Sequence, residues 1–306
     1  MADLDDLLQK TSRTFALAIP LLPEPTRKAV SVAYLLFRIA DTFEDATAWS
    51  RAERIAALES FIALVKRPDA VNAAPSLMAR WLTRAPVDHA GYLELLQKTD
   101  QVLSELEQLP PAVQAIVVRH SVRTGQGMAT VVARGDEQGS LRLTSMKDLT
   151  DYCYLVAGIV GELLTEVFMH DTPSLSAEAE ELNRRMVAFG EGLQLVNILK
   201  DTTDDARDGR VYLPPTVTRA QVLAQARADL DQANAYVQAL QRGGAPKGYL
   251  GFTGISLMLA YATLNRLEQH GAGAKVSRDE VGRLFSVLQS AIESNVKLDL
   301  KAHALA

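Results

Sequence analysis

The sequence has little of several features that would otherwise assign a protein quickly. Cys153 is its only cysteine, so an internal disulfide is excluded and a cytoplasmic location is compatible. No basic tract is present and the formal net charge is −5, which gives no reason to expect nucleic acid as a partner. The acidic start, Met1 to Lys10, lacks the basic and apolar regions of a signal peptide.

Patterns typical of sheets and of membrane spans are also missing. No long run combines strict apolar–polar alternation with β-branched residues, so we expect no sheet. The longest uncharged stretch, Gly248 to Asn265, contains three glycines, two threonines and a serine, a composition that favours a buried core helix over a transmembrane segment. With no internal repeat and no low-complexity linker, residues 1–306 are predicted to form one all-α domain.

Helical periodicity covers most of the chain instead. Apolar residues recur at three- and four-residue spacing, and the predicted helices are Ala29–Asp45, Arg51–Lys66, Tyr92–Leu106, Pro111–Arg134, Leu149–Met169, Ser176–Asp205, Arg219–Gln241, Gly254–Gln269 and Arg278–Leu298. Ser145 and Ser176 are candidate N-caps, and Ser277 with Glu280 predicts a capping box.

Two of these helices carry a line of polar residues on an otherwise apolar background. The first polar stripe lies at offsets 0, 4, 7 and 11 and consists of Tyr34, Arg38, Asp41 and Asp45. The second polar stripe lies at offsets 0, 3, 7 and 11 and consists of Gln194, Asn197, Asp201 and Asp205. These offsets place each set along one helix face.

Each stripe ends in two aspartates four residues apart, and like charges at that spacing repel. Bound Mg²⁺ would offset the repulsion, because it prefers hard oxygen ligands and completes its shell with water and phosphate oxygens. A single pair of this kind is more often a solvated acidic face. Two pairs on apolar helices favour a metal-diphosphate site with facing stripes, with Arg38 and Lys200 as phosphate contacts.

Four segments then resemble the squalene and phytoene synthase family. They are SRTFALAIPLLP at 12–23, YLLFRIADTFEDA at 34–46, DYCYLVAGIVG at 151–161 and LQLVNILKDTTDDARDGRVYLP at 193–214. The resemblance implies a class I isoprenoid synthase bundle with a central cavity. It also implies Mg²⁺-dependent (or Mn²⁺-dependent) head-to-head condensation of two prenyl diphosphates, commonly farnesyl, through a cyclopropylcarbinyl diphosphate.

The resemblance also implies roles for individual residues. The implied metal ligands are Asp41, Asp45, Asn197, Asp201 and Asp205. The implied diphosphate contacts are Ser12, Arg13, Tyr34, Arg38, Gln194 and Lys200. Tyr152 matches the acid/base tyrosine of the first half-reaction, although Tyr152 and Tyr154 alone would read as half-buried aromatics.

The segment after Tyr152 has two further interpretations. Ala157, Gly158 and Gly161 either allow close backbone packing or leave room for a prenyl chain. The nearby apolar residues Val156, Val160, Leu163 and Leu164 are candidates for the wall of a hydrocarbon tunnel, where dry walls would protect carbocations from water, or they are ordinary core.

The sequence departs from the family pattern at a few positions. Lys200 replaces the usual Arg, which keeps the charge but loses the planar fork. Ser277 falls near an expected basic position, although Lys275 and Arg278 flank it and are candidates for binding NADPH. NADPH would reduce the final cation to squalene, whereas phytoene and dehydrosqualene formation needs no reductant.

Other functions stay open on the sequence alone. A catalytically inactive, lipid-binding family member would be expected to lose the aspartates, and all four are present. Terpene cyclisation on one prenyl diphosphate would use the same metal chemistry. Because the expected substrate is hydrophobic, loose association with a membrane surface is compatible with a cytoplasmic enzyme.

Overall fold

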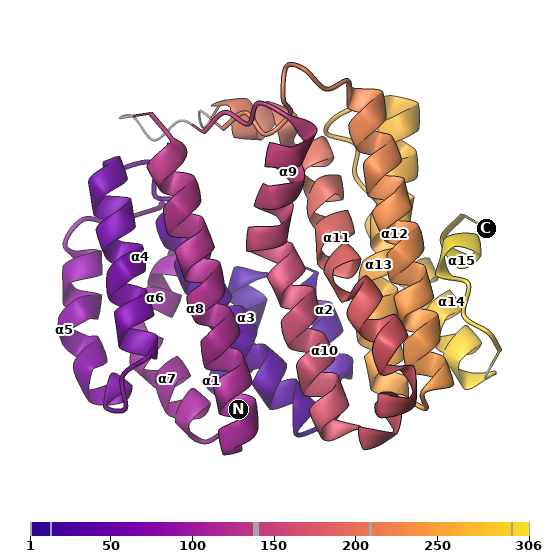
Figure 1. Cartoon of the computed structure of the whole chain (residues 1–306), viewed down its shortest axis with the longest axis horizontal. Coiled ribbons are helices and arrows are strands. Elements are labelled where there is room, and N and C mark those ends of the chain that lie inside the picture. Colours follow the sequence, from indigo (N-terminus) through magenta and orange to yellow (C-terminus); the bar gives the residue numbers. More distant parts are fainter. Residues whose placement is uncertain (1, 13, 137–140, 208–209, 295, 306) are drawn as a thin grey trace. The chain divides into compact units, whose positions relative to one another are not determined.

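The computed structural model describes residues 2–12, 14–136, 141–207, 210–294 and 296–305, and these are helical almost throughout (Figure 1). Within the described residues the one β-type pairing is an isolated bridge between Arg142 and Val211. The prediction of an all-α chain is therefore confirmed. Clustering of contacts divides the chain into two compact units, residues 1–17 with 24–141 and residues 18–23 with 142–306.

The first unit is built around three helices, α3, α4 and α8. Its helices are α1 (Ala2–Thr11), α3 (Thr26–Glu44), α4 (Arg51–Val65), α5 (Ala70–Leu82), α6 (Ala90–Gln97), α7 (Thr99–Glu107) and α8 (Pro111–Arg134), and the short α2 (Phe15–Ala18) spans the unit boundary. Phe43 anchors the core, with ring centroids 4.8 Å from Trp81 and 6.5 Å from Phe61. Burial of such rings is the main stabilising contribution.

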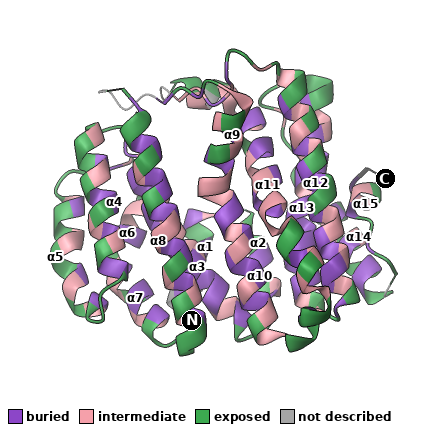
Figure 2. Ribbon diagram, viewed as in Figure 1, coloured by how far each residue is buried: buried purple, intermediate pink, exposed green. Residues whose placement is uncertain are grey.

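The second unit packs its long helices against one another. Its elements are η1 (Ile19–Leu21), α9 (Met146–Cys153), η2 (Tyr154–Gly158), α10 (Ile159–Asp171), η3 (Pro173–Glu178), α11 (Ala179–Arg207), α12 (Arg219–Arg242), α13 (Lys247–His270), α14 (Arg278–Glu293) and α15 (Leu300–Leu305). Helix α13 is buried along most of its length (Figure 2), which confirms the core-helix reading of 248–265.

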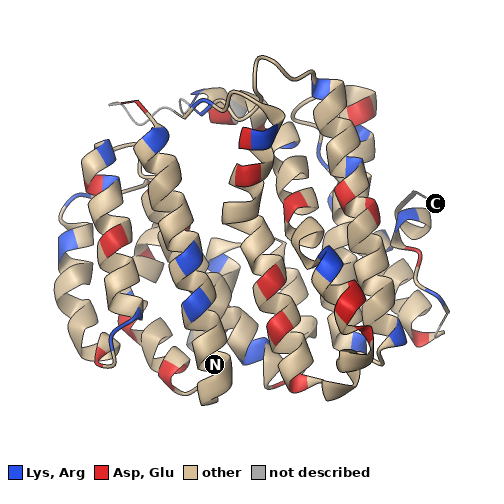
Figure 3. Ribbon diagram, viewed as in Figure 1, with Lys and Arg blue, Asp and Glu red and all other residues tan. Residues whose placement is uncertain are grey.

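Several predicted boundaries are right because the local signals are strong. Helix α8 has the predicted bounds, with Pro111 at its first position and Gly135 after its last. The Ser145 hydroxyl accepts a hydrogen bond from the Asp148 N–H at 3.1 Å, as predicted for an N-cap. Charges of both signs are interspersed over the helices, in keeping with the absence of a basic tract (Figure 3).

Other boundaries differ from the prediction. The predicted helix 92–106 is two helices, α6 and α7, separated at Lys98, and α14 ends at Glu293 rather than at Leu298. Ser176 lies inside the 3₁₀ turn η3 and is not an N-cap. Ser277 does cap α14, but the Glu280 carboxylate pairs with Arg266 instead of closing the capping box.

One helix passes a length and hydropathy test for a membrane span. The continuous stretch Met146–Asp171 has a mean hydropathy of 1.5 over its most apolar 18 residues, and 56% of that window is buried inside the protein. Its glycines pack against α11 at backbone distance, as described below. This stretch therefore contributes to the packing of the second unit.

Candidate active site

The first polar stripe lies on α3 in the first unit, and three of its members form one cluster. The Arg38 guanidinium forms an ion pair with the Asp41 carboxylate and donates a hydrogen bond to the Tyr34 hydroxyl at 3.4 Å. The Tyr34 hydroxyl in turn donates to the Thr11 carbonyl oxygen at 2.9 Å, which ties the cluster to α1. Apolar residues that alternate with the stripe along α3, such as Leu35 and Ile39, are fully buried, and their burial sets the orientation of the helix.

Arg38 is held more firmly than the sequence indicates. Its guanidinium carbon lies 5.7 Å from the centre of the Tyr34 ring and 5.2 Å from the centre of the Tyr92 ring. Burial lowers the pKa of Arg38, but the negative charge of Asp41 and the two tyrosines outweigh burial and leave the pKa raised. Its Nε atom is buried without a hydrogen-bond partner, so the side chain retains donor capacity for a ligand.

The other residues predicted for this part of the site lie at the end of α3 and after α1. Asp45 is the C-cap of α3, and its N–H donates to the Asp41 carbonyl oxygen at 2.8 Å. Ser12 lies after α1, where its hydroxyl accepts from the Phe15 N–H at 2.9 Å, and the Phe15 ring lies 5.6 Å from that of Tyr34. Arg13 lies outside the described residues.

The second polar stripe lies on α11 in the second unit and is looser. The Lys200 ammonium contacts the Asn197 side-chain oxygen at 3.3 Å and the Asp201 carboxylate at 3.2 Å. Asn197 is exposed, and the Asp201 side chain is 41% exposed. Gln194 and Asp205 are half-buried, on the same face.

The candidate NADPH residues lie on a loop tied to this stripe. The Gly273 N–H donates to the Lys200 carbonyl oxygen at 3.0 Å, which fixes the loop between α13 and α14 beside α11. Gly271 and Gly273 have φ near +80°, a conformation that favours glycine. Lys275 and Arg278 are exposed on this loop and at the start of α14.

Tyr152, the predicted acid/base residue, is buried in the second unit with 4% of its surface exposed. Its hydroxyl donates a hydrogen bond to the Tyr212 hydroxyl at 3.1 Å, and the two rings stack with centroids 4.8 Å apart. Tyr212 lies in the family-like segment 193–214, but its contact with Tyr152 could not be predicted because the two tyrosines are 60 positions apart.

Close backbone packing explains the small residues that follow Tyr152. A Cβ on Gly161 would lie 1.9 Å from the Met186 carbonyl oxygen, and one on Gly190 would lie 1.9 Å from the Ala157 carbonyl oxygen. The glycines therefore let α10 and η2 pack directly on α11, and the packing interpretation is confirmed. Leu163 and Leu164 are buried, while Val156 and Val160 are half-buried; their role as a tunnel wall stays a prediction.

The same packing region contains an acidic pair that the sequence analysis missed. Burial, then the charges of Asp229 and Asp151, raises the pKa of Glu191 to about 7. Burial also raises the pKa of Asp229 to about 6, and its Oδ2 atom has no hydrogen-bond partner. Burial with these two carboxyls raises the pKa of Cys153, so this thiol is inert at neutral pH.

Extending the second stripe would have found Glu191. It precedes Gln194 by three residues and so continues the same face of α11.

The carboxylates of the two stripes suit a hard cation such as Mg²⁺ that takes its remaining ligands from the substrate. Among the described residues no three His, Cys, Asp or Glu side chains converge as a ready-made metal cage. Each stripe instead offers two carboxylates with a cation beside them, a set that suits Mg²⁺ sharing its shell with water and phosphate oxygens. The stripes belong to different units, and the prediction that they face each other stays a prediction.

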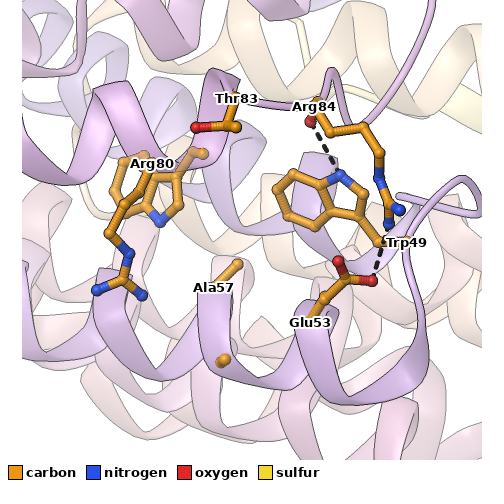
Figure 4. A pocket seen from close by; sticks show the side chains of 8 residues that line it. Trp49, Glu53, Ala57, Arg80, Thr83 and Arg84 are labelled. Carbon is orange, nitrogen blue, oxygen red and sulfur yellow. Dashed lines mark hydrogen bonds and ion pairs between the residues drawn. The ribbon is translucent and has the colours of Figure 1, made fainter.

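A small pocket in the first unit is separate from both stripes. It has a volume of about 250 Å³ and lies between α4 and α5, with Trp49 and Trp81 in its walls (Figure 4). The Trp49 indole donates to the Arg84 carbonyl oxygen at 2.9 Å, and the Arg84 guanidinium pairs with Glu53 at 2.8 Å. Most of its polar groups are thus already satisfied within the protein.

Comparison with known families gives a match over most of the chain. The family model described as squalene/phytoene synthase matches residues 8–222, which include the described members of both stripes and Tyr152. The squalene synthase of Eremothecium gossypii is 30% identical over 215 residues, covering 69% of this chain and 45% of that protein. The squalene synthase of Bos taurus is 29% identical over 210 residues, covering 68% of this chain and 45% of that protein. The matched segment therefore spans less than half of these relatives.

Solved structures share the fold along nearly the whole chain. A structure of TcSQS in complex with the ligand BPH1237 has a TM-score of 0.75 at 23% identity, covering 99% of this chain and 90% of that one. A dehydrosqualene synthase in complex with a ligand has a TM-score of 0.57 at 21% identity, covering 96% of each chain. These likenesses confirm the predicted class I isoprenoid synthase fold.

Proposed function

Because this chain belongs to the squalene/phytoene synthase family, we propose that it condenses two prenyl diphosphates head to head, with farnesyl diphosphate as the expected substrate. The observation that carries the proposal is the Arg38 cluster on α3. A guanidinium placed between two tyrosine rings, paired with an aspartate and retaining an unused donor, suits a diphosphate that arrives with a metal ion.

Each stripe has a defined part in this function. Asp41 and Asp45 on α3, and Asp201 and Asp205 with Asn197 on α11, would hold the metal ions. When bound, Mg²⁺ would neutralise the diphosphate and stabilise the charge that develops as it leaves. Arg38 and Lys200 contact phosphate oxygens directly, and Tyr34, Gln194, Ser12 and Arg13 complete the polar surface.

Tyr152 moves the proton in the first half-reaction. A phenol is a weak base and a poor nucleophile toward a carbocation, so it can relay the proton that the carbocation loses to the released diphosphate without ending the reaction by capture. Its burial beside Tyr212 supports this role, since a dry surrounding keeps water from the cation. The expected intermediate is a cyclopropylcarbinyl diphosphate, with release of inorganic diphosphate.

The proposal includes reduction by NADPH in the second half-reaction. The exposed cations Lys275 and Arg278 lie on the loop that Gly273 joins to Lys200, and they can contact the phosphates of the nucleotide. Lys275 and Arg278 lie in the same unit as the second stripe, which supports this part of the proposal.

The test is product analysis by mass spectrometry with purified protein, farnesyl diphosphate and Mg²⁺, with and without NADPH. We expect a reduced C30 hydrocarbon with NADPH, and diphosphate release in both cases. A C30 product that is the same with and without NADPH would support the condensation and contradict the reduction. A C15 product alone would favour cyclisation, and intact substrate under all conditions would contradict the proposal.

A further inference from the structure

We propose that Tyr212 is a positioning residue for the first half-reaction, holding the Tyr152 hydroxyl in the orientation in which it can accept a proton. This inference rests on the proposed function, because it assigns Tyr212 a task only if Tyr152 is the acid/base group. It concerns residues of the second unit alone.

Two independent contacts fix Tyr152 against Tyr212. The hydroxyl–hydroxyl distance is 3.1 Å, and the rings stack with a centroid distance of 4.8 Å and an interplanar angle of 28°. The stacking restricts the plane of the Tyr152 ring, and the hydrogen bond restricts rotation of its O–H. A side chain restrained at both points loses little further freedom when substrate binds.

Two hydrogen bonds before the start of α9 bring the segments that carry the two tyrosines together. The Leu143 N–H donates to the Val211 carbonyl oxygen at 3.1 Å, and the Thr216 hydroxyl donates to the Thr144 carbonyl oxygen at 2.8 Å. Directly after Thr144, Ser145 caps α9, the helix that carries Tyr152. The segment that carries Tyr212 is therefore joined to the same support as Tyr152.

The direction of the hydrogen bond matters for the chemistry. A phenol has one proton to donate and two lone pairs that can accept. The hydrogen bond from Tyr152 to Tyr212 fixes the torsion of the Tyr152 O–H, and so fixes the direction in which the Tyr152 oxygen can relay the substrate's proton to the released diphosphate. Tyr212 exchanges no proton with substrate in this account; it sets where the Tyr152 proton points.

Tyr34 in the first unit is held differently, because its hydroxyl donates to the Thr11 carbonyl oxygen and accepts a hydrogen bond from Arg38. Tyr34 is thus held for binding an anion. The Tyr152 hydroxyl, by contrast, is bonded to the hydroxyl of another tyrosine.

The test compares Tyr212→Phe, Tyr152→Phe, the double variant and a matched control, Tyr236→Phe. The control also removes a buried tyrosine hydroxyl from the second unit, one bonded to Thr165 at 2.9 Å. Diphosphate release from farnesyl diphosphate is measured without NADPH, and thermal unfolding verifies that each variant folds.

We expect Tyr212→Phe to lower kcat about 10-fold or more with KM changed less than about 2-fold, and the control to stay near wild type. The double variant should be no slower than Tyr152→Phe, because the two hydroxyls act as one unit. A Tyr212→Phe variant as active as the control, or effects that multiply in the double variant, would overturn the inference.

A second substitution covers the case in which Tyr212→Phe fails to fold. Incorporation of 3-fluorotyrosine at position 212 retains the shape of the ring and makes its hydroxyl more acidic. The pH profile of kcat should shift relative to wild type, and an unchanged profile would overturn the inference. Failure of the proposed function is distinct, because the wild-type protein would then release no diphosphate at all.

Discussion

The two polar stripes end in aspartates at the same offsets but differ in how firmly the protein holds them. On α3 the cation is an arginine placed between two aromatic rings and paired with Asp41, with 25% of its side chain exposed. On α11 the cation is a lysine that contacts Asn197 at 3.3 Å and Asp201, whose side chain is 41% exposed, at 3.2 Å. The cation of the first stripe is therefore held by aromatic rings as well as by a carboxylate, whereas Lys200 is held by polar contacts.

This difference revises an expectation from like-charge spacing. Repulsion between aspartates four residues apart predicts that an Asp→Asn change relieves strain in the metal-free protein. Arg38 already compensates Asp41, so loss of that carboxylate would leave a guanidinium without its partner. On α11 the Lys200–Asp201 pair is longer, at 3.2 Å, and more exposed, so loss of the Asp201 carboxylate should cost less.

The largest expected effect comes from Asp41→Asn and Asp201→Asn. Each should lower Mg²⁺-dependent diphosphate release by about 10³-fold, because each removes a charge that the metal needs. Stability should separate the two: the unfolding free energy of Asp41→Asn falls by about 1 kcal/mol, while that of Asp201→Asn changes by less than about 0.5 kcal/mol. Kinetics and urea unfolding measure the two quantities. Equal stability effects would contradict the comparison.

Exchange of the two cations sharpens the contrast. Arg38→Lys should raise KM for farnesyl diphosphate about 10- to 100-fold, because the ammonium loses both the planar fork and the ring stacking. Lys200→Arg should leave KM unchanged or lower it, because the exposed site can accept a guanidinium. Steady-state kinetics of the pair measures both. An equal loss in both variants would show that the two stripes bind cations alike.

The buried end of the second stripe predicts a dependence of stability on pH. The folded state binds a proton at Glu191 with a pKa of about 7, whereas the unfolded chain releases it near the ordinary value of 4.5. Stability is therefore lost as pH rises through this interval, and Glu191→Gln avoids the loss. At pH 8 the variant should gain on the order of 2 kcal/mol, and at pH 4 almost nothing.

Urea unfolding at both pH values measures this, with exposed Glu293→Gln as the control. An equal gain at pH 4 and pH 8 would show that the glutamine acts through packing rather than through charge. Because burial contributes most to the raised pKa, Asp229→Asn alone should reduce the pH dependence only in part.

The smallest effect concerns the aromatic contact that the sequence did not indicate. Tyr92→Leu removes one of the two rings that flank Arg38, and KM for farnesyl diphosphate should rise about 2- to 5-fold, as expected for one cation–π contact. Tyr249→Phe, a buried tyrosine change in the second unit, serves as the control. An unchanged KM in Tyr92→Leu would mean that Asp41 and Tyr34 alone position the guanidinium.

The sequence predicts what is local and periodic. Helix α8 and both polar stripes follow from spacing and from cap residues, and the helix that carries each stripe was placed correctly. The break at Lys98 and the π-helical turn Tyr154–Gly158 were missed, because they depend on packing rather than on a marker residue. Tyr92 and Tyr212 were missed because each joins the site from a segment distant in sequence.

The central claim is that both stripes bind metal ions together with a diphosphate. Calorimetric titration of Mg²⁺ in the presence of farnesyl thiodiphosphate, which resists ionisation, tests it directly in the wild type, Asp41→Asn and Asp201→Asn. We predict more than one Mg²⁺ per wild-type chain and fewer in each variant. Binding of the analogue without Mg²⁺, or a metal count unchanged in both variants, would contradict the account.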